Sequence, residues 1–508
     1  MFKQTTRRRF LHATAAGGAW AGLGDLEFLT RLPAVSAAQA AGNGRGVPLR
    51  PEIEPLVRLL EDAPRERLLE QVAQRIKGGT SYQEVLAALL LAGVRNIQPR
   101  PQVGFKFHAV LVVNSAHLAS IASPEEHRWL PIFWALDHFK ESQAQDVREG
   151  DWTMQPVDEA ALPAPDKARR TFIEAMESWD EAKADAAVAA LARSARKEDL
   201  FDLFCRFGSR DFRSIGHKAI YVANSWRTLG EIGWQHAEPV LRSLAYALLQ
   251  HEDGSPAQDD RPADRPGREN IARAKRFRDG WQTGQADDGA AAELLATLHR
   301  GSAADACESV VDLINRGVAP QSVWDALLVG AGELLVRQPG IVGLHAVTTS
   351  NALRYAFEAG ANDDNRRLLL LQNAAFLPMF REAMQSRGHV AETDLTRLEP
   401  LPLATGAAAE VEILADVSRD PMAAARKMLG YARRHPDPQP LIDAARLLVF
   451  LKGNDAHDYK FSSAVLEDYR RVSPARRACY LAAGAFSLVG SGGADNALVQ
   501  RTRAALGA

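Results

Sequence analysis

The feature that most constrains the fold of this chain is a helical pattern that returns at a period of roughly 110–120 residues. From residue 50 onward, apolar residues recur at three- and four-residue steps, which is the spacing of one face of an α-helix. The pattern of each copy predicts four helices. An amphipathic helix is followed by a more apolar helix, then by a short connection with Gly or Pro, a third helix that begins with a histidine, and a fourth helix. Four copies align, over approximately residues 60–147, 168–252, 290–385 and 408–490.

The copies predict a single all-α repeat domain over residues 50–508. A helical unit of this size cannot bury its apolar face alone, so neighbouring units must stack. Four units of about four helices can form either an open α-solenoid or a closed α/α toroid, and the sequence does not separate the two. Polar segments rich in Gly, Pro and charge are predicted to be exposed insertions; they span residues 148–168, 252–268 and 386–406.

Composition excludes several classes of protein. Of the 508 residues, 46% are hydrophobic and 24% charged, so a large core can be buried. The balance of 61 Lys and Arg against 63 Asp and Glu offers no basic excess, and we expect no nucleic-acid partner. Without a run of 18 apolar residues, we expect no membrane span in the mature chain. The cysteines are too few for a disulfide framework: Cys205, Cys307 and Cys479.

The N-terminus resembles a twin-arginine (Tat) export signal. Its motif is Thr6-Arg7-Arg8-Arg9-Phe10-Leu11-His12, followed by a weakly apolar stretch rich in Ala and Gly and by small-residue cleavage sites at 34–40. We therefore predict a signal peptide over residues 1–40; the alternative is an ordinary basic tail. The resemblance implies a periplasmic or secreted protein, with the Tat export machinery as a partner. That route carries folded proteins, often with a cofactor already bound.

One histidine recurs at the start of the third helix of every copy. Four equivalent positions out of thirteen histidines are hard to attribute to chance: His108, His217, His345 and His457. If the third helices line one space, the imidazoles point into it. Imidazoles with few thiolates favour a first-row transition metal over magnesium or calcium. The alternative interpretation is structural, since a histidine after a turn can cap a helix or bond a neighbouring repeat.

Three copies also carry an asparagine six or seven residues after the histidine: Asn114, Asn224 and Asn351. This is about two helical turns, so each asparagine lies near the same helix face as its histidine. The fourth copy has Ser462 and Ser463 there. We expect the asparagines to act as catalytic residues that orient metal ligands or substrate.

Two stretches resemble the questin oxidase-like family, which is associated with oxidative ring opening of aromatic polyketides. One stretch is His345-Ala346-Val347-Thr348-Thr349-Ser350-Asn351-Ala352-Leu353-Arg354. The other is His217 with Ile220, followed by Leu244-Ala245-Tyr246-Ala247. The resemblance implies an oxidoreductase on an all-α, histidine-bearing scaffold. The chain departs from the family by its export signal and by Ser214-Ile215-Gly216 in place of a Gly-rich motif, so neither substrate nor cofactor carries over.

The leading hypothesis is an exported metal-dependent oxidoreductase, of oxygenase or oxidase type, that acts on a small-molecule substrate. The four histidines would bind iron or copper. A second hypothesis is a non-enzymatic helical-repeat scaffold that binds a partner, which predicts separately buried and hydrogen-bonded histidines. A third is an α/α-toroid enzyme that acts on polysaccharide, which would need an open groove with paired carboxylates.

Overall fold

A computed structural model describes residues 53–99, 107–250 and 254–507 of this protein. These residues form 22 α-helices, α3 to α24, and no β-strand, apart from one isolated bridge between Gln285 and Val318. The predicted all-α, helical-repeat fold is confirmed. The predicted signal peptide, residues 1–40, lies outside the described residues. Within the described ranges, every helix is too short or too polar to cross a membrane.

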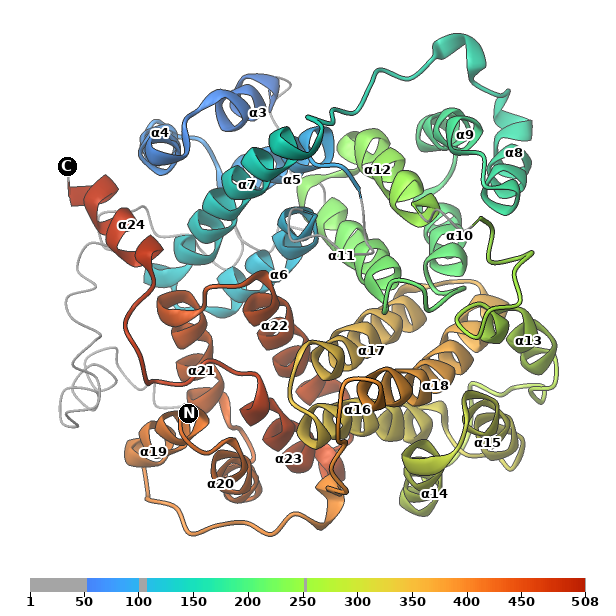
Figure 1. The fold of residues 1–508 in the computed structure, drawn as a ribbon, viewed down its shortest axis with the longest axis vertical. Helices are drawn as coiled ribbons and strands as arrows, with labels where there is room; N and C mark the ends of the chain where they lie inside the picture. Colours follow the sequence, from blue (N-terminus) through green and yellow to red (C-terminus); the bar gives the residue numbers. More distant parts are fainter. Residues whose placement is uncertain (1–52, 100–106, 251–253, 508) are drawn as a thin grey trace, which may run out of the picture.

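Four helices form the inner layer of a closed ring (Figure 1). They are α6 (His108–Ala122), α11 (His217–Ile232), α17 (Ile341–Ala359) and α22 (Ala456–Arg471). Each packs against the next, and α22 packs against α6. Because this cycle closes, the protein is a toroid rather than an open solenoid.

The remaining helices lie outside this layer, where each inner helix is preceded by three helices and followed by one. Each group therefore holds one helix more than the expected four, while the number and bounds of the sequence repeats stay a prediction. The first two groups add α3 (Ile53–Asp62), α4 (Arg65–Lys77), α5 (Tyr82–Asn96), α7 (Trp129–Glu149), α8 (Pro165–Ser178), α9 (Glu181–Ser194), α10 (Lys197–Gly208) and α12 (Ala237–Leu249). The last two add α14 (Asp288–Arg300), α15 (Ala303–Asn315), α16 (Pro320–Arg337), α18 (Asp363–Gln385), α19 (Ala407–Val417), α20 (Pro421–Arg434), α21 (Gln439–Lys452) and α23 (Pro474–Ala483).

The two ends of the ring also meet in the outer layer. Helix α24 (Ala497–Gly507) follows the fourth group and packs against α4 and α7 of the first. Arg501 binds the carboxylate of Asp137 on α7 and donates to the carbonyl of Arg65 at 2.7 Å. The closure therefore does not depend on the inner helices alone.

Burial explains the two layers. Inner helix α6 is apolar nearly all round, and its buried residues run without a break from His108 to His117. A helix of this kind is stable only inside a core. Outer helix α4 buries one stripe, which includes Leu68, Val72 and Ile76, and carries charge on its other side.

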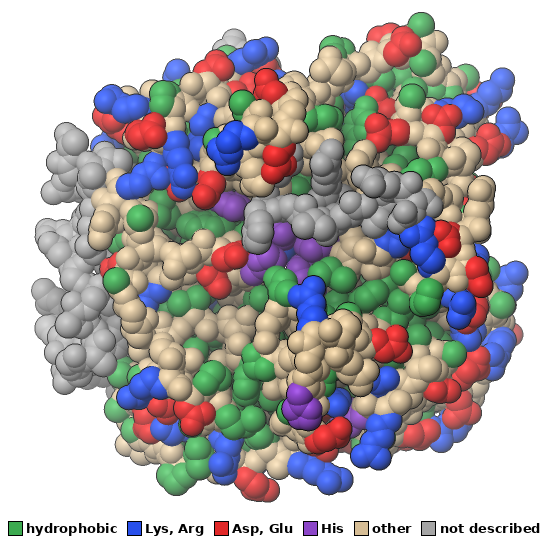
Figure 2. Space-filling model, in the orientation of Figure 1, with side chains coloured by type: hydrophobic (Ala, Val, Ile, Leu, Met, Phe, Trp, Pro, Cys, Tyr) green, Lys and Arg blue, Asp and Glu red, His purple; other side chains and the backbone are tan. Residues whose placement is uncertain are grey.

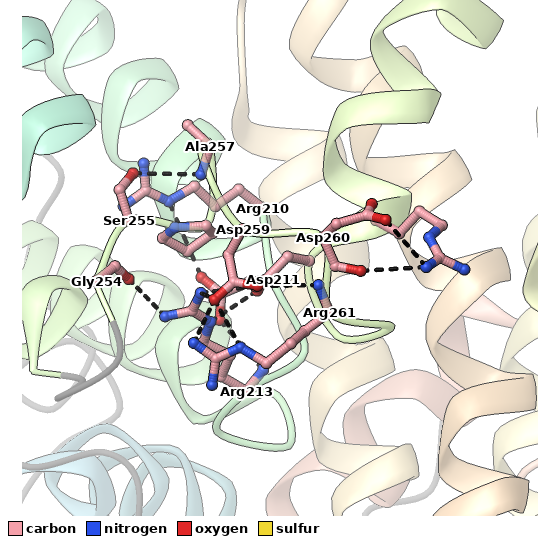
Figure 3. Close-up of polar contacts among 12 residues, drawn as sticks. Arg210, Asp211, Arg213, Gly254, Ser255, Ala257, Asp259, Asp260 and Arg261 are labelled. Atoms are coloured by element: carbon pink, nitrogen blue, oxygen red, sulfur yellow. Dashed lines mark hydrogen bonds and ion pairs between the residues drawn. The ribbon is translucent and has the colours of Figure 1, made fainter.

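The segment after α12 differs from the exposed insertion predicted over residues 252–268. Residues from 265 onward form α13 (Arg265–Ala274), and Asp264 is almost completely buried. Arg213 binds Asp264 at 2.6 Å and the carbonyl of Gly254 at 2.6 Å. Arg213 and Arg261 also converge on Asp259, at 3.6 and 2.7 Å (Figure 3). The prediction was therefore wrong in part: Ser255, Asp264 and Pro266 are buried, whereas Ala257, Asp260 and Pro262 are exposed as expected.

Candidate metal centre

The four recurrent histidines meet at the centre of the ring. Each offers a ligand atom, and these atoms all lie within 4.8 Å of one another. The residues are 6%, 5%, 1% and 8% exposed, in the order His108, His217, His345 and His457. Neighbouring rings contact one another in the order of the helices, with centroid separations of 5.2, 4.3, 5.4 and 4.6 Å around the cycle. Figure 2 shows histidine side chains at the centre of this face of the molecule.

Three of the four histidines lie at the start of an inner helix. His108 and His217 are the first residues of α6 and α11, and His457 is the second residue of α22. His345 differs from the prediction, because α17 begins at Ile341 and the histidine lies about one turn inside it. The cluster therefore combines three helix starts with one residue from further along a helix.

A close approach of two inner helices positions His217. Ile215 and Gly216, just before it, both have positive φ, at 45° and 85°. A side chain at Gly216 would collide with Thr349 on α17. Glycine adopts this left-handed conformation without strain. Gly216 thus allows α11 to lie directly against α17, which brings His217 to His345.

Hydrogen bonds fix the orientation of two rings. The Nδ1 of His217 lies 2.8 Å from the carbonyl of Ser214, and the Nδ1 of His457 lies 2.6 Å from the carboxylate of Asp455. Both partners are acceptors, so each Nδ1 carries the proton and each Nε2 keeps a lone pair. A carboxylate or carbonyl behind an imidazole is the usual support of a metal-binding histidine.

One nitrogen separation fits two ligands of a common metal ion. The Nε2 atoms of His108 and His217 are 3.2 Å apart. Two imidazoles bound to one ion at about 2.0–2.1 Å have nitrogens about 2.9–3.4 Å apart, from a square to a tetrahedral arrangement. The Nδ1 of His345 is buried and has no hydrogen-bond partner among the described residues. A bound ion would satisfy this buried nitrogen.

Burial keeps the four imidazoles neutral at pH 7. It lowers the pKa of His217 to about 3, lowers the pKa values of His108 and His345 well below the ordinary range, and lowers that of His457 as well. The positive charge of Lys460 acts in the same direction on all four. Neutral imidazole is the form that binds metals.

Asp455 is ionised behind His457. Burial alone would raise its pKa, but hydrogen bonds from the side chain and backbone of His457 lower it to about 2. Asp455 also caps α22, where it accepts the backbone N–H of His457 at 2.8 Å. One residue thus begins the helix and orients its histidine.

The three asparagines line a cavity of about 10 Å³ further along the inner helices. Asn114 donates to Asn224 at 3.3 Å, and Asn224 donates to the carbonyl of Leu111 at 2.9 Å. Asn351 donates to Glu467 and Asp468, at 2.8 and 2.9 Å. These bonds join neighbouring inner helices. The predicted role of the asparagines in orienting metal ligands or substrate stays a prediction.

Lys460 lines the same cavity, and the sequence analysis did not select it. It lies on α22 three residues after His457, is 3% exposed, and its Nζ has no hydrogen-bond partner among the described residues. Burial lowers its pKa to about 7. The positions three residues after the other histidines carry Leu111, Ile220 and Thr348. A comparison of the copies at this position was the signal that could have found it.

No family model, curated protein or solved structure matches this chain. The resemblance to the questin oxidase-like family therefore stays a prediction. The geometry does separate two of the hypotheses, because a scaffold with separately buried histidines is not what the ring contains. The cluster of four buried histidines is compatible with a metal site.

Proposed function

We propose that this protein is an exported oxidoreductase whose four central histidines bind one iron or copper ion. The observation that supports the proposal most is the convergence of four imidazoles from four separate helices within 4.8 Å. Burying four neutral rings this close together is unfavourable unless their polar atoms have partners, and the Nδ1 of His345 has none among the described residues. A single cation would bind one nitrogen of each ring.

The donor set favours a transition metal. Imidazole suits zinc, copper, iron and nickel, whereas magnesium and calcium select oxygen ligands. The free cysteines do not belong to this group of ligands. A bound iron or copper ion would supply one-electron chemistry, in line with the oxidoreductase that the family resemblance implies. The substrate is proposed to be a small molecule, and we propose no nucleic-acid partner.

The residues of this chain hold and orient the ligands. Asp455 keeps the Nδ1 proton of His457, and the carbonyl of Ser214 keeps that of His217. These contacts present both Nε2 atoms to the centre of the cluster, where each of the four histidines is at most 8% exposed. The protein thus supplies a preorganised set of nitrogens.

Export in a folded state suits this architecture. The four ligands are separated by more than a hundred residues from one to the next along the chain, so the site forms only when the ring closes. Twin-arginine export, which we propose for the N-terminal signal, would carry the ring with its metal already bound to the periplasm or medium. Metal binding would then stabilise the folded state before transport.

Metal content tests the proposal. We expect the mature protein, exported by its own signal, to contain about one iron or copper ion per chain by plasma mass spectrometry. The double variant His217→Ala, His345→Ala should contain none. The matched control is His389→Ala, His435→Ala, which removes two exposed histidines and should retain the metal. A folded wild-type protein without metal would contradict the proposal.

A second measurement tests the redox part. Electron paramagnetic resonance should show the ion reduced by ascorbate and reoxidised by air. Stoichiometric zinc in place of iron or copper would leave a metal centre and contradict the oxidoreductase.

A further inference from the structure

One largely buried arginine on α21 lacks a close partner within the described chain. The side chain of Arg446 is 14% exposed, and its ion pair is a 3.8 Å contact with Asp443 on its own helix. Arg242, which is similarly buried, instead binds Asp185 at 2.7 Å. Burial lowers the pKa of Arg446 to about 10. A buried cation without a close partner is unfavourable, so the position of Arg446 needs an explanation.

Arg446 lines a pocket between α6, α21 and α22. Helix α22 packs against both α6 and α21, and the three helices are neighbours in the ring (Figure 1). The pocket has a volume of about 260 Å³. Pockets for drug-sized ligands measure about 300–1,000 Å³, so this one suits a smaller molecule. Because Arg446 lines this space, a ligand there could supply the partner that the chain does not.

Much of the wall of this pocket is apolar. Leu118, Ala119, Ile121 and Ala122 come from the C-terminal end of α6, and Leu466 comes from α22. Such a wall favours a ligand with a hydrocarbon part, which loses its contact with water on binding. The ligand is therefore expected to combine a small apolar body with a group that pairs with the arginine.

The charges of the pocket favour a negative charge on that group. Glu467 is the one carboxylate among the described lining residues, and Arg227 and Arg471 already bind it, at 3.0 and 2.9 Å. Arg470 is exposed and adds further positive charge. The guanidinium group of Arg446 is left without a carboxylate at hydrogen-bond distance. Its planar fork of N–H donors matches the two oxygens of a carboxylate.

We propose that this pocket binds a small monocarboxylate with an apolar body, whose carboxylate pairs with Arg446 and whose hydrocarbon part packs against the end of α6. The site is separate from the proposed metal centre. His108 begins α6, whereas Leu118 and the other pocket residues of that helix start about 15 Å further along its axis. The inference therefore goes beyond the metal-dependent function and does not depend on it.

Benzoate and hexanoate are the probes, as an aromatic and an aliphatic carboxylate. Isothermal titration calorimetry of the mature protein should show one site per chain for at least one of them. Benzamide and hexanamide keep the body without the charge, and acetate keeps the charge without the body. Each of these three should bind more weakly, by about ten-fold or more. A folded wild-type protein that binds neither carboxylate, or binds the amides equally well, would overturn the proposal.

Variants of the pocket locate the binding. Arg446→Met and Arg446→Gln should each weaken carboxylate binding by about ten-fold or more. Ala122→Trp, which fills the pocket from α6 and keeps the charge, should weaken it as well. The matched control is Arg300→Met, which removes an exposed arginine at the end of α14 and should bind as the wild type does. Circular dichroism checks the fold of each variant. Equal affinity in the wild type and the folded Arg446 variants would overturn the site.

A further variant separates this site from the metal centre, because a carboxylate can also bind a metal ion. The double variant His217→Ala, His345→Ala should bind the carboxylate as the wild type does. Loss of binding in this variant, with its fold intact, would place the ligand at the histidines and overturn the pocket. If the wild type contains no metal, the proposed function fails, while carboxylate binding that depends on Arg446 still supports the pocket.

Discussion

Lys218 and His217 are neighbours on α11 and both are buried, but their surroundings differ. Lys218 points to the outer side, where it binds Asp211; both side chains are at most 1% exposed. Beside them Arg213 binds the carboxylate of Asp264. Arg213 also donates to the carbonyl of Gly254, as Figure 3 shows. His217 points to the inner side, where three more histidines and an unpaired lysine lie.

The two regions differ in whether their buried polar groups are paired. We call Asp211, Arg213, Lys218 and Asp264 the outer ion network, and the four histidines with Lys460 the central cluster. In the outer ion network every charge has its opposite, so the network is complete without a ligand. In the central cluster the Nδ1 of His345 and the ammonium group of Lys460 lack partners within the described chain. Buried groups of the second kind need an explanation, and the proposed metal ion would supply one for the nitrogen of His345.

The largest effect on stability should come from the outer ion network. Asp211→Ala leaves Lys218 buried without its partner and should lower the free energy of unfolding by about 3–5 kcal/mol. The double variant Asp211→Leu, Lys218→Met removes both charges and should recover most of that loss. Urea unfolding of the two metal-free proteins measures the difference. If Asp211→Ala were no less stable than the double variant, charge pairing would not explain the stability of the outer ion network.

The pair of His117 and Glu231 is an intermediate case, and we expect its effect on stability to depend on pH. His117 bonds Tyr82 at 3.0 Å on one nitrogen, while its other nitrogen lies 3.9 Å from Glu231. Burial lowers the pKa of His117 from 6.5 to about 4, so its contribution to stability is lost as pH falls through that window. Burial raises the pKa of Glu231 from 4.5 to about 7, so its contribution is lost as pH rises through that window. The two slopes oppose each other in the wild type.

Variants at these two residues should uncover the separate slopes. In Glu231→Gln the free energy of unfolding should rise with pH between 4 and 6.5, by up to about 1.4 kcal/mol per pH unit. In His117→Gln it should fall as pH rises from 4.5 to 7. Denaturant unfolding across this pH range checks both. Identical pH profiles in the two variants would show that this pair is not the source.

A smaller effect is expected from replacing Asp455, which orients the proposed metal ligand His457. Asp455→Asn removes the negative charge behind His457 and keeps an oxygen that can cap α22. We expect the affinity for metal to fall by about 10–100-fold. The metal-free protein should also lose some stability, because the hydrogen bonds that lower the pKa of Asp455 stabilise the folded state. Competition with a chelator of known affinity measures the first quantity. Unchanged affinity would mean that Asp455 serves only as the cap.

The smallest effect should come from Asn114→Ala. Its one hydrogen bond to Asn224 is long, at 3.3 Å, and its Oδ1 is unsatisfied. We expect a loss of about 0.5–1.5 kcal/mol in the free energy of unfolding, with the metal content unchanged. Thermal unfolding and metal analysis check the two parts. Loss of metal in this variant would assign Asn114 to the binding site itself.

The sequence predicted the histidines because repetition isolates them. His108, His217, His345 and His457 stand at equivalent places in four similar segments, and the 3.6-residue periodicity places each on a helix. Whether those helices meet depends on the closure of α22 against α6, which is a contact between residues far apart in the chain. Local periodicity does not predict a contact between residues so far apart in the chain.

The supporting residues were harder to find for a different reason. Asp455 and Lys460 occur in one quarter of the ring alone, so only their departure from the other copies marks them. Asp264 looked exposed because it lies in a polar, Pro-rich segment, whereas its burial depends on Arg213, which lies 51 residues away in sequence. Pairing with a distant charge therefore buries Asp264, although local composition predicts that it is exposed.

Anomalous diffraction from crystals of the natively exported protein tests the central claim most directly. Data on both sides of the iron and copper absorption edges should show one peak, equidistant from His108, His217, His345 and His457 and within bonding distance of their nitrogens. A peak elsewhere in the ring, or four imidazoles hydrogen-bonded to one another around no anomalous scatterer, would contradict the account.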